Sequence, residues 1–105
     1  MKFESVEEFE EKYGKENNPE AYLDMGYVLD YMEGIGVLIR EGYVSIRLVA
    51  LLNGGFIKYS WEKFQPFIRA YREKYNWPRW YIEFEFLYDT LMKYAEEHPE
   101  LQITQ

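Results

Sequence analysis

The side chains that could act as nucleophiles or bases are few and scattered along the chain. The single histidine, His98, precedes Pro99 at the expected end of a helix. A positively charged side chain near the last carbonyl groups of a helix is favourable, and this is a sufficient reason for a histidine there. Ser5 and Ser45 are expected to cap helices, and the sequence contains no cysteine. Nucleophilic catalysis requires a nucleophile beside a base, so we expect no hydrolase-type triad.

Two pairs of carboxylates, Asp30 with Glu33 and Glu83 with Glu85, could in principle share a proton in acid–base catalysis. At these spacings on a helix, such residues are more often surface or ion-pair residues. The chain contains no Glu-x-x-His pair of the type that holds di-iron centres in helical bundles. We therefore predict a protein that is not an enzyme and binds no metal or cofactor.

The elements that must position these side chains are helices. From Ile57 to Tyr75, apolar residues including Trp61 recur at alternating spacings of four and three, which is typical of one buried helical face. Pro66 lies in the middle of this segment and removes the amide that would bond to the carbonyl of Glu62. The pattern predicts a central helix with a kink at the proline.

Similar periodicity, with capping and stop signals, predicts further helices on either side of the central one. The fold class we predict is all-α: a compact single-domain bundle of about five helices spanning residues 1–105. Residues 100–105 are expected to fray. The helices expected besides the central one are a short one over about 5–14, a long one over about 19–40, a short one over 46–52 ended by Asn53-Gly54-Gly55, and a last one over about 81–97.

Composition limits the environment and the partners. The chain has 105 residues and a net charge of −7, which disfavours broad attraction to nucleic acid or anionic membranes. No segment approaches the roughly 20 apolar residues of a spanning helix, and the lack of cysteine is compatible with a reducing compartment. We expect a cytoplasmic protein without a membrane partner. Only residues 51–79 are basic, with six basic and two acidic side chains.

Three glycines inside the long second helix require an explanation. Gly26, Gly34 and Gly36 each cost roughly 1 kcal/mol relative to alanine in a helix interior. Close approach of another helix is the favoured reason. One alternative is a small-ligand pocket between the second and central helices, with Gly34 and Gly36 as its floor and Trp61 in its wall. The other is a bend in the second helix.

Arginines and tryptophans gather at the end of the central helix and just after it. Arg79 stands between Trp77 and Trp80, and arginine stacked on large aromatic rings is common at interfaces. Together with Arg69 and Arg72, these residues form a candidate interaction surface. Alternatively, the tryptophans fill the gap where two helices join. Acidic side chains four residues from the basic ones, such as Glu73 after Arg69, are expected to pair with them. The basic side chains therefore do not form a continuous positive surface that could follow a nucleic-acid backbone.

The segment from Trp61 to Arg72 resembles the W-E-K-x-x-P-x-I-x-x-x-R core of a family of uncharacterised small helical domains. The similarity covers roughly residues 25–97, and we expect the family-like core to span about 19–97. The resemblance implies a helical fold and no known activity. It also implies that some members carry membrane-spanning helices ahead of this domain, and we expect no such helix in this sequence. The resemblance also directs attention to a polar network between helices, with Glu33, Glu62 and Glu85 beside Arg69 and Arg72.

The leading functional hypothesis is a non-enzymatic helical module that docks a protein partner or a second copy of itself. Phe, Trp and Tyr make up 20% of the residues, and a chain of this size is not expected to bury all of them. The surface proposed for docking is Trp77 to Tyr81 with the neighbouring basic side chains. A small-ligand pocket is the alternative, and nucleic-acid binding is the least favoured hypothesis.

Overall fold

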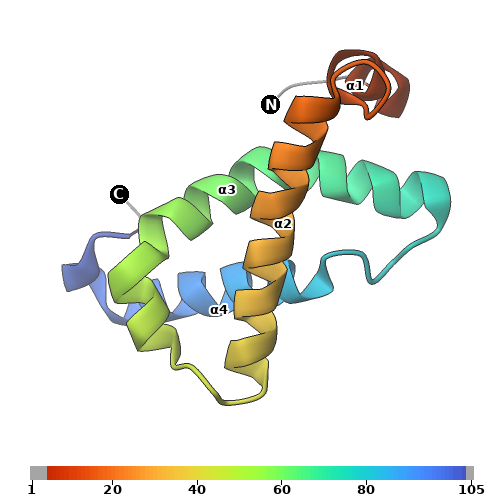
Figure 1. The fold of residues 1–105 in the computed structure, drawn as a ribbon. Coiled ribbons are helices and arrows are strands. Elements are labelled where there is room, and N and C mark those ends of the chain that lie inside the picture. The colour runs from red at the N-terminus through yellow and green to blue at the C-terminus, as the bar shows by residue number, and fades with distance from the viewer. Residues whose placement is uncertain (1–4, 104–105) are drawn as a thin grey trace.

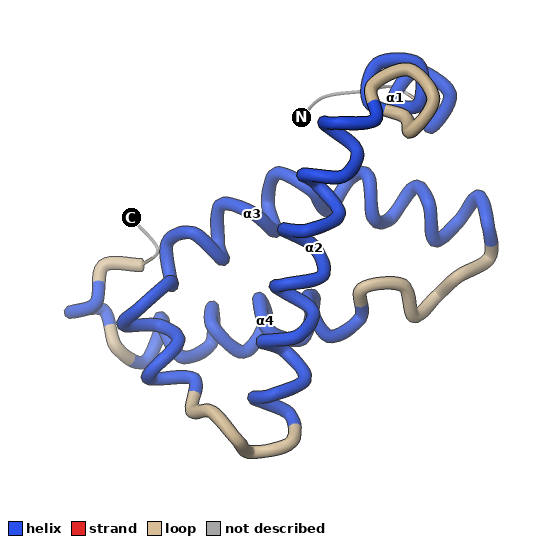
Figure 2. The backbone as a smooth tube through the Cα atoms, viewed as in Figure 1, coloured by secondary structure: helices blue, strands red, loops and turns tan. Residues whose placement is uncertain are grey.

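The computed structural model describes residues 5–103, and within that range the secondary structure is helical, with helices joined by loops and without strands (Figures 1 and 2). The predicted all-α, compact single-domain fold is confirmed. The predicted number of about five helices is wrong, because the short helix predicted over 46–52 and the central helix form one continuous helix. The elements are α1 (Val6–Tyr13), α2 (Pro19–Arg40), α3 (Ile46–Tyr75), α4 (Ile82–Glu97) and a short 3₁₀-helix, η1 (Pro99–Leu101).

The first three helices begin at residues whose side chains satisfy free amides. Ser5 accepts from the amide of Glu8, Asn18 from that of Ala21 and Ser45 from that of Leu48. Such N-caps replace hydrogen bonds that the first turn of a helix lacks. Helix α2 ends before Gly42, whose positive φ of 82° reverses the chain at little cost.

Helix α3 is continuous where the sequence predicts two helices separated by a turn. The predicted turn at Asn53-Gly54-Gly55 is wrong because Ala50 and Ile57, on either side of it, belong to one buried stripe. Gly54 also has a packing role, since a Cβ there would lie 3.0 Å from Cδ1 of Ile103. Core packing therefore outweighs the roughly 1 kcal/mol that each glycine costs in a helix.

Helix α4 packs against both α2 and α3, and α2 crosses over it (Figure 1). The buried stripe predicted from Ile57 to Tyr75 enters the core at Ile57, Trp61 and Ile68, but its last member, Tyr75, is 40% exposed. Trp61 packs edge-on against Phe84 of α4, with ring centroids 5.2 Å apart. Helix α3 runs on through Pro66, whose side chain is exposed.

The end of the described chain is also folded against the core. Residues Pro99–Leu101 form η1, and the half-buried side chains of Leu101 and Ile103 pack against the core. Of the tail expected to fray, residues 104 and 105 lie outside the described range, as do residues 1–4. Within residues 5–103, no helix combines the length and the apolar character needed to cross a membrane.

Candidate interaction surface

Helix α4 begins without a capping side chain of its own. Its N-cap residue, Tyr81, has a positive φ of 55° and makes no side-chain cap. The missing acceptor comes from α2: the Glu33 carboxylate accepts from the amide of Phe84 over 2.8 Å. One turn earlier, Asp30 accepts from the Tyr81 hydroxyl over 2.7 Å. Both members of this carboxylate pair therefore bond to the start of α4.

Gly36 continues the same stripe of α2 and brings the two helices into backbone contact. A Cβ at Gly36 would collide with the backbone carbonyl of Glu83. On the next turn, Arg40 pairs with the Glu83 carboxylate over 2.5 Å and stacks over the Phe86 ring. Close helix packing is thus the reason for Gly36, whereas a Cβ at Gly26 or Gly34 would have nothing within 4 Å.

Burial raises the pKa of Glu33 above its ordinary value of 4.5. The hydrogen bond from Phe84 lowers the pKa, and the nearby negative charge of Glu83 raises it. Because desolvation is the largest of these effects, the charged form of Glu33 is less stable at the start of α4 than it is in water.

Among the residues of the predicted polar network, Arg72 centres a contact with Glu85 and the α3–α4 loop. The Arg72 guanidinium donates to the carbonyl oxygen of Trp80 over 2.8 Å and to Glu85 over 2.7 Å. Its Nη2 is buried without a hydrogen-bond partner. Arg69 reaches Glu85 only at 3.5 Å and bonds more closely to Gln65. Arg72 therefore tethers the α3–α4 loop rather than forming an exposed basic surface.

Glu62 belongs to a separate contact between α3 and α4. It accepts from Lys58, the pairing expected at a spacing of four residues, and from the Tyr88 hydroxyl over 2.9 Å. The Lys58 and Tyr88 hydrogen bonds lower the pKa of Glu62. Within residues 5–103, Glu33, Glu62 and Glu85 thus serve three different contacts rather than one network, and Arg69 does not pair with Glu73.

The structure separates the three residues of the predicted pocket. Trp61 is buried, Gly36 is covered by the backbone of α4, and Gly34 opens to solvent. None of them lines any of four cavities found among the described residues, one of which lies between Met25 and Val28 of α2 and Phe64 of α3. The three residues named from the sequence therefore do not line a common cavity.

The aromatic residues after α3 are only partly exposed. Trp77 is 48% exposed, and Trp80 is half-buried with its ring stacked on Tyr71. Arg79 is exposed and makes no ion pair with any residue of the described range. Both tryptophans thus help to fill the junction between α3 and α4, and the ring of Trp77 remains accessible to a partner.

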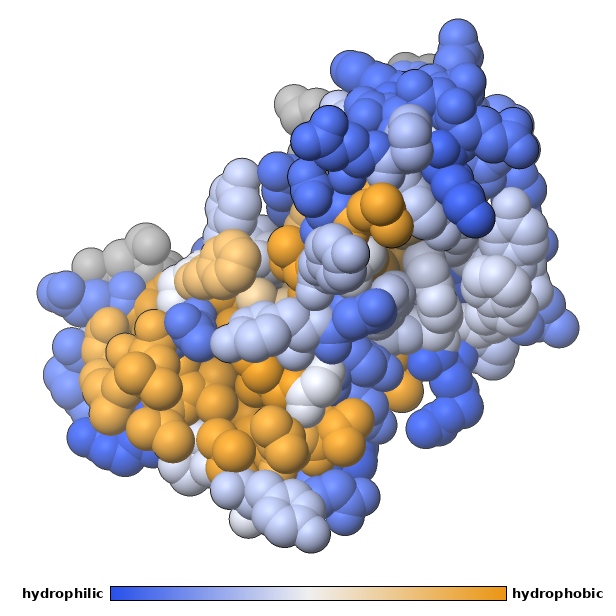
Figure 3. Space-filling view, in the orientation of Figure 1, coloured by the Kyte–Doolittle hydropathy of each residue, from blue (hydrophilic) through white to orange (hydrophobic). Residues whose placement is uncertain are grey.

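A broad gathering of exposed apolar side chains lies elsewhere, over the second half of α2 and the first half of α3 (Figure 3). Helical spacing places these α3 residues opposite its buried stripe, so α3 is apolar on both sides there. The sequence pattern does not reveal this surface, because helical periodicity alone does not tell an exposed apolar stripe from a buried one. We name it the α2–α3 face and define it as Tyr31, Leu38, Leu48, Leu52, Phe56 and Tyr59.

The α2–α3 face is large for a chain of this size. Leu52 is 71% exposed and Tyr59 is 61% exposed. With Tyr27 at its edge, the face presents roughly 600–800 Å² of apolar and aromatic surface, against about 300–600 Å² for the largest patch of a typical monomer. Two helical glycines, Gly34 and Gly55, open onto the same side, with nothing within 4 Å of a side-chain carbon placed there.

Comparison with known proteins places the chain in a family without an assigned function. The sequence pattern of the family described as Domain of unknown function (DUF4760) matches residues 2–91, so the chain belongs to this family. The match begins earlier than the resemblance seen in the sequence and confirms it as one to an uncharacterised helical domain. Neither the curated proteins nor the solved structures gave a match.

Proposed function

We propose that this protein is a non-catalytic helical interaction module that associates with a second copy of itself through the α2–α3 face. The supporting observation is that the first half of α3 is apolar on both its buried and its exposed side. A helix that is apolar all round normally lies inside a larger assembly. The exposed area approaches the ~800 Å² that each partner contributes to a standard-size interface.

The apolar character of the face, rather than its charges, favours a second copy as the partner. In a two-fold dimer, each surface patch meets its own copy. The α2 acids do not lie at the rim of the face: Asp30 and Glu33 bond to the start of α4, and the other two lie in the first half of α2. An apolar patch that meets its own copy needs no charged partner.

The open glycines fit the same arrangement. Nothing within the described chain explains Gly34 or Gly55, each of which costs roughly 1 kcal/mol in a helix. A glycine on an exposed helix surface allows the backbone of another helix to approach closely. The absence of cysteine fits a reducing compartment, and we propose the cytoplasm as the location.

Sedimentation velocity across a concentration series tests the proposal. We expect the native chain to show a concentration-dependent dimer and Leu52→Glu to shift the equilibrium to monomer, because a charge in an apolar interface is desolvated without a partner. Leu23→Glu is the matched control, since Leu23 is also an exposed leucine, at 55%, but lies outside the α2–α3 face. A native chain that stays monomeric at hundreds of micromolar refutes self-association.

We also propose that α3 bends at Pro66, near the boundary between its apolar first half and its charged second half. Proline has no amide to donate to the carbonyl four residues earlier, and its ring crowds the preceding turn. Spin labels at Arg47 and Glu73, both exposed, would be roughly 39 Å apart along a straight helix. A clearly shorter distance that lengthens in Pro66→Ala supports the bend, and equal distances exclude it.

A further inference from the structure

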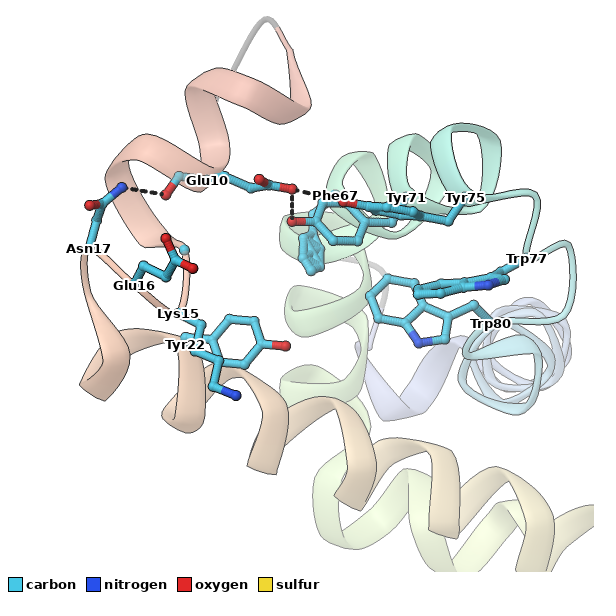
Figure 4. A pocket seen from close by; sticks show the side chains of 11 residues that line it. Glu10, Lys15, Glu16, Asn17, Tyr22, Phe67, Tyr71, Tyr75, Trp77 and Trp80 are labelled. Atoms are coloured by element: carbon cyan, nitrogen blue, oxygen red, sulfur yellow. Dashed lines mark hydrogen bonds between the residues drawn. The ribbon is translucent and has the colours of Figure 1, made fainter.

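A cavity of about 490 Å³ lies where α1 and the following loop meet the second half of α3 and the α3–α4 loop (Figure 4). This volume falls within the range of roughly 300–1,000 Å³ typical of small-molecule sites. No residue of the α2–α3 face lines the cavity, so a ligand here is independent of the proposed self-association. Its aromatic lining consists of Tyr22, Phe67, Tyr71, Tyr75, Trp77 and Trp80.

The rings on the α3 side are held in place by one another. Tyr71 stacks on Trp80, with centroids 5.5 Å apart and planes at 18°, and Tyr75 stacks on Trp77 at 4.9 Å and 24°. Tyr22 of α2 stands across the open space from this cluster (Figure 4). The wall is therefore preformed, and ligand binding does not have to order it.

The other side of the cavity is acidic. The hydroxyl groups of Tyr71 and Tyr75 donate to Oε1 of Glu10 over 2.9 and 3.2 Å (Figure 4). These bonds fix a carboxylate beside the aromatic rings. Burial and the bond to Glu10 raise the pKa of Tyr71, so its hydroxyl keeps the proton that it donates. Glu16 adds a second carboxylate to the lining.

Two lysines only partly offset this acidity. Lys74 lies 3.8 Å from Glu10 and closer, at 3.2 Å, to Glu7 outside the cavity. Lys15 also lines the cavity, but it is an exposed residue of the loop after α1. The chain as a whole has a net charge of −7, which further favours cations over anions near the site.

Aromatic faces with a fixed carboxylate are the environment that binds a methylated ammonium group. Such a cation is attracted by ring faces within about 6 Å of its charge. A primary ammonium or a guanidinium needs several hydrogen-bond acceptors to replace its water. Here the Glu10 oxygen nearest the rings is already occupied by two tyrosine hydroxyls. A quaternary ammonium group donates no hydrogen bond and needs none.

We propose that this cavity binds a quaternary ammonium group, with its methyl groups against the Trp77–Trp80 wall and its charge facing Glu10. The group has two sources with the same chemistry: a free trimethylammonium compound, or a trimethylated lysine side chain of a peptide. Both present a trimethylammonium group to the same aromatic rings.

An NMR titration that follows the tryptophan indole N–H signals tests the proposal and distinguishes the sources. Choline is expected to shift the Trp77 and Trp80 signals saturably and to leave that of the buried Trp61 in place. The neutral isostere 3,3-dimethyl-1-butanol is expected to bind at least about tenfold more weakly, because it lacks the charge. A trimethyllysine peptide that binds much more tightly than choline, while its unmethylated form does not bind, identifies a side chain as the source.

Variants link binding to the named residues. Trp77→Leu is expected to weaken binding about tenfold, whereas Tyr43→Leu, at an exposed aromatic residue outside the cavity, leaves it unchanged. Glu10→Gln keeps an acceptor for the tyrosine hydroxyls but removes the charge, and is expected to weaken binding several-fold. Equal affinity for choline and its neutral isostere, no saturable shift with either choline or the peptide, or native affinity in a folded Glu10→Gln variant would each overturn the proposal.

Discussion

The Glu33 carboxylate of α2 accepts a hydrogen bond of 2.8 Å from the Phe84 amide in the first turn of α4. The cap of one helix is thus supplied by another helix, 51 residues away in sequence. Three residues further along α2, Gly36 lies against the backbone of Glu83. The start of α4 is therefore positioned by a hydrogen bond and by close backbone contact on one stripe of α2.

Removing this cap should destabilise the fold. We expect Glu33→Ala to lower the free energy of unfolding by about 1–2 kcal/mol, because the Phe84 amide loses its acceptor. Glu33→Gln keeps a carbonyl acceptor at the same place and should remain close to the native protein. Urea denaturation at neutral pH measures both, and an equal loss in the two variants would contradict a capping role.

The same residue makes a prediction about pH. Because its pKa in the folded protein is raised above 4.5, folded Glu33 holds its proton to higher pH than unfolded Glu33. Its contribution to stability therefore falls as the pH rises from the unfolded pKa through the folded pKa, and it stays reduced above that. Glu33→Gln has no such loss, so its stability relative to the native protein should rise from pH 4 to pH 7. If the free energies of unfolding of the variant and the native protein differ by the same amount from pH 4 to pH 7, the prediction is wrong.

The contact at Gly36 predicts opposite effects for two similar substitutions. Gly36→Ala should destabilise the protein by about 1–3 kcal/mol, since the methyl group must push away the Glu83 carbonyl. Gly26→Ala, at a helical position with open space, should stabilise it by up to about 1 kcal/mol. Thermal and urea unfolding of both variants compare them directly. Stabilisation by Gly36→Ala would show that the helices can separate without cost.

The two arginines that contact Glu85 should differ in their contribution to stability. The Arg72 side chain is 12% exposed, and that of Arg69 is 53% exposed. Arg72→Ala should cost about 2–4 kcal/mol, because it leaves Glu85 and the Trp80 carbonyl without their donor in a partly buried site. Arg69→Ala should cost less than about 1 kcal/mol. Similar costs in denaturant titrations of the two variants would argue against Arg72 as the tether.

The continuity of α3 can be tested at Gly55. In a helix with open space around it, Gly55→Ala should raise the free energy of unfolding by about 0.5–1 kcal/mol. A turn that required positive φ at this position would make the same substitution destabilising. The unfolding of the variant should be measured at low micromolar protein concentration, so that unfolding of the monomer is observed separately from self-association.

Local signals in the sequence predict the structure well where a side chain acts on its own segment. Ser5 and Ser45 cap the helices they are expected to cap, and Trp61 lies in the core. The same reasoning fails at Asn53-Gly54-Gly55, since glycine in a sequence marks a turn and a tight helix contact equally well. Only the position of Ile103 against Gly54 distinguishes the two.

The candidate site shows the same division. Trp77 and Arg79 are exposed as expected. Arg72, predicted from the sequence to lie on the same candidate surface, instead donates hydrogen bonds to Glu85 and to the Trp80 carbonyl. The α2–α3 face could have been suspected from the excess of apolar residues in the first half of α3. Periodicity does not tell a buried stripe from an exposed one when both sides of a helix are apolar.

By itself, the sequence determined the all-helical class, the starts of α1, α2 and α3 and the buried stripe through Trp61, because backbone hydrogen bonding and the helical repeat act over a few residues. The tertiary structure decided which acid caps α4, which glycine admits another backbone, and which aromatic rings surround the cavity beside Glu10. Those outcomes depend on contacts between residues tens of positions apart, and such contacts exist only once the helices have packed.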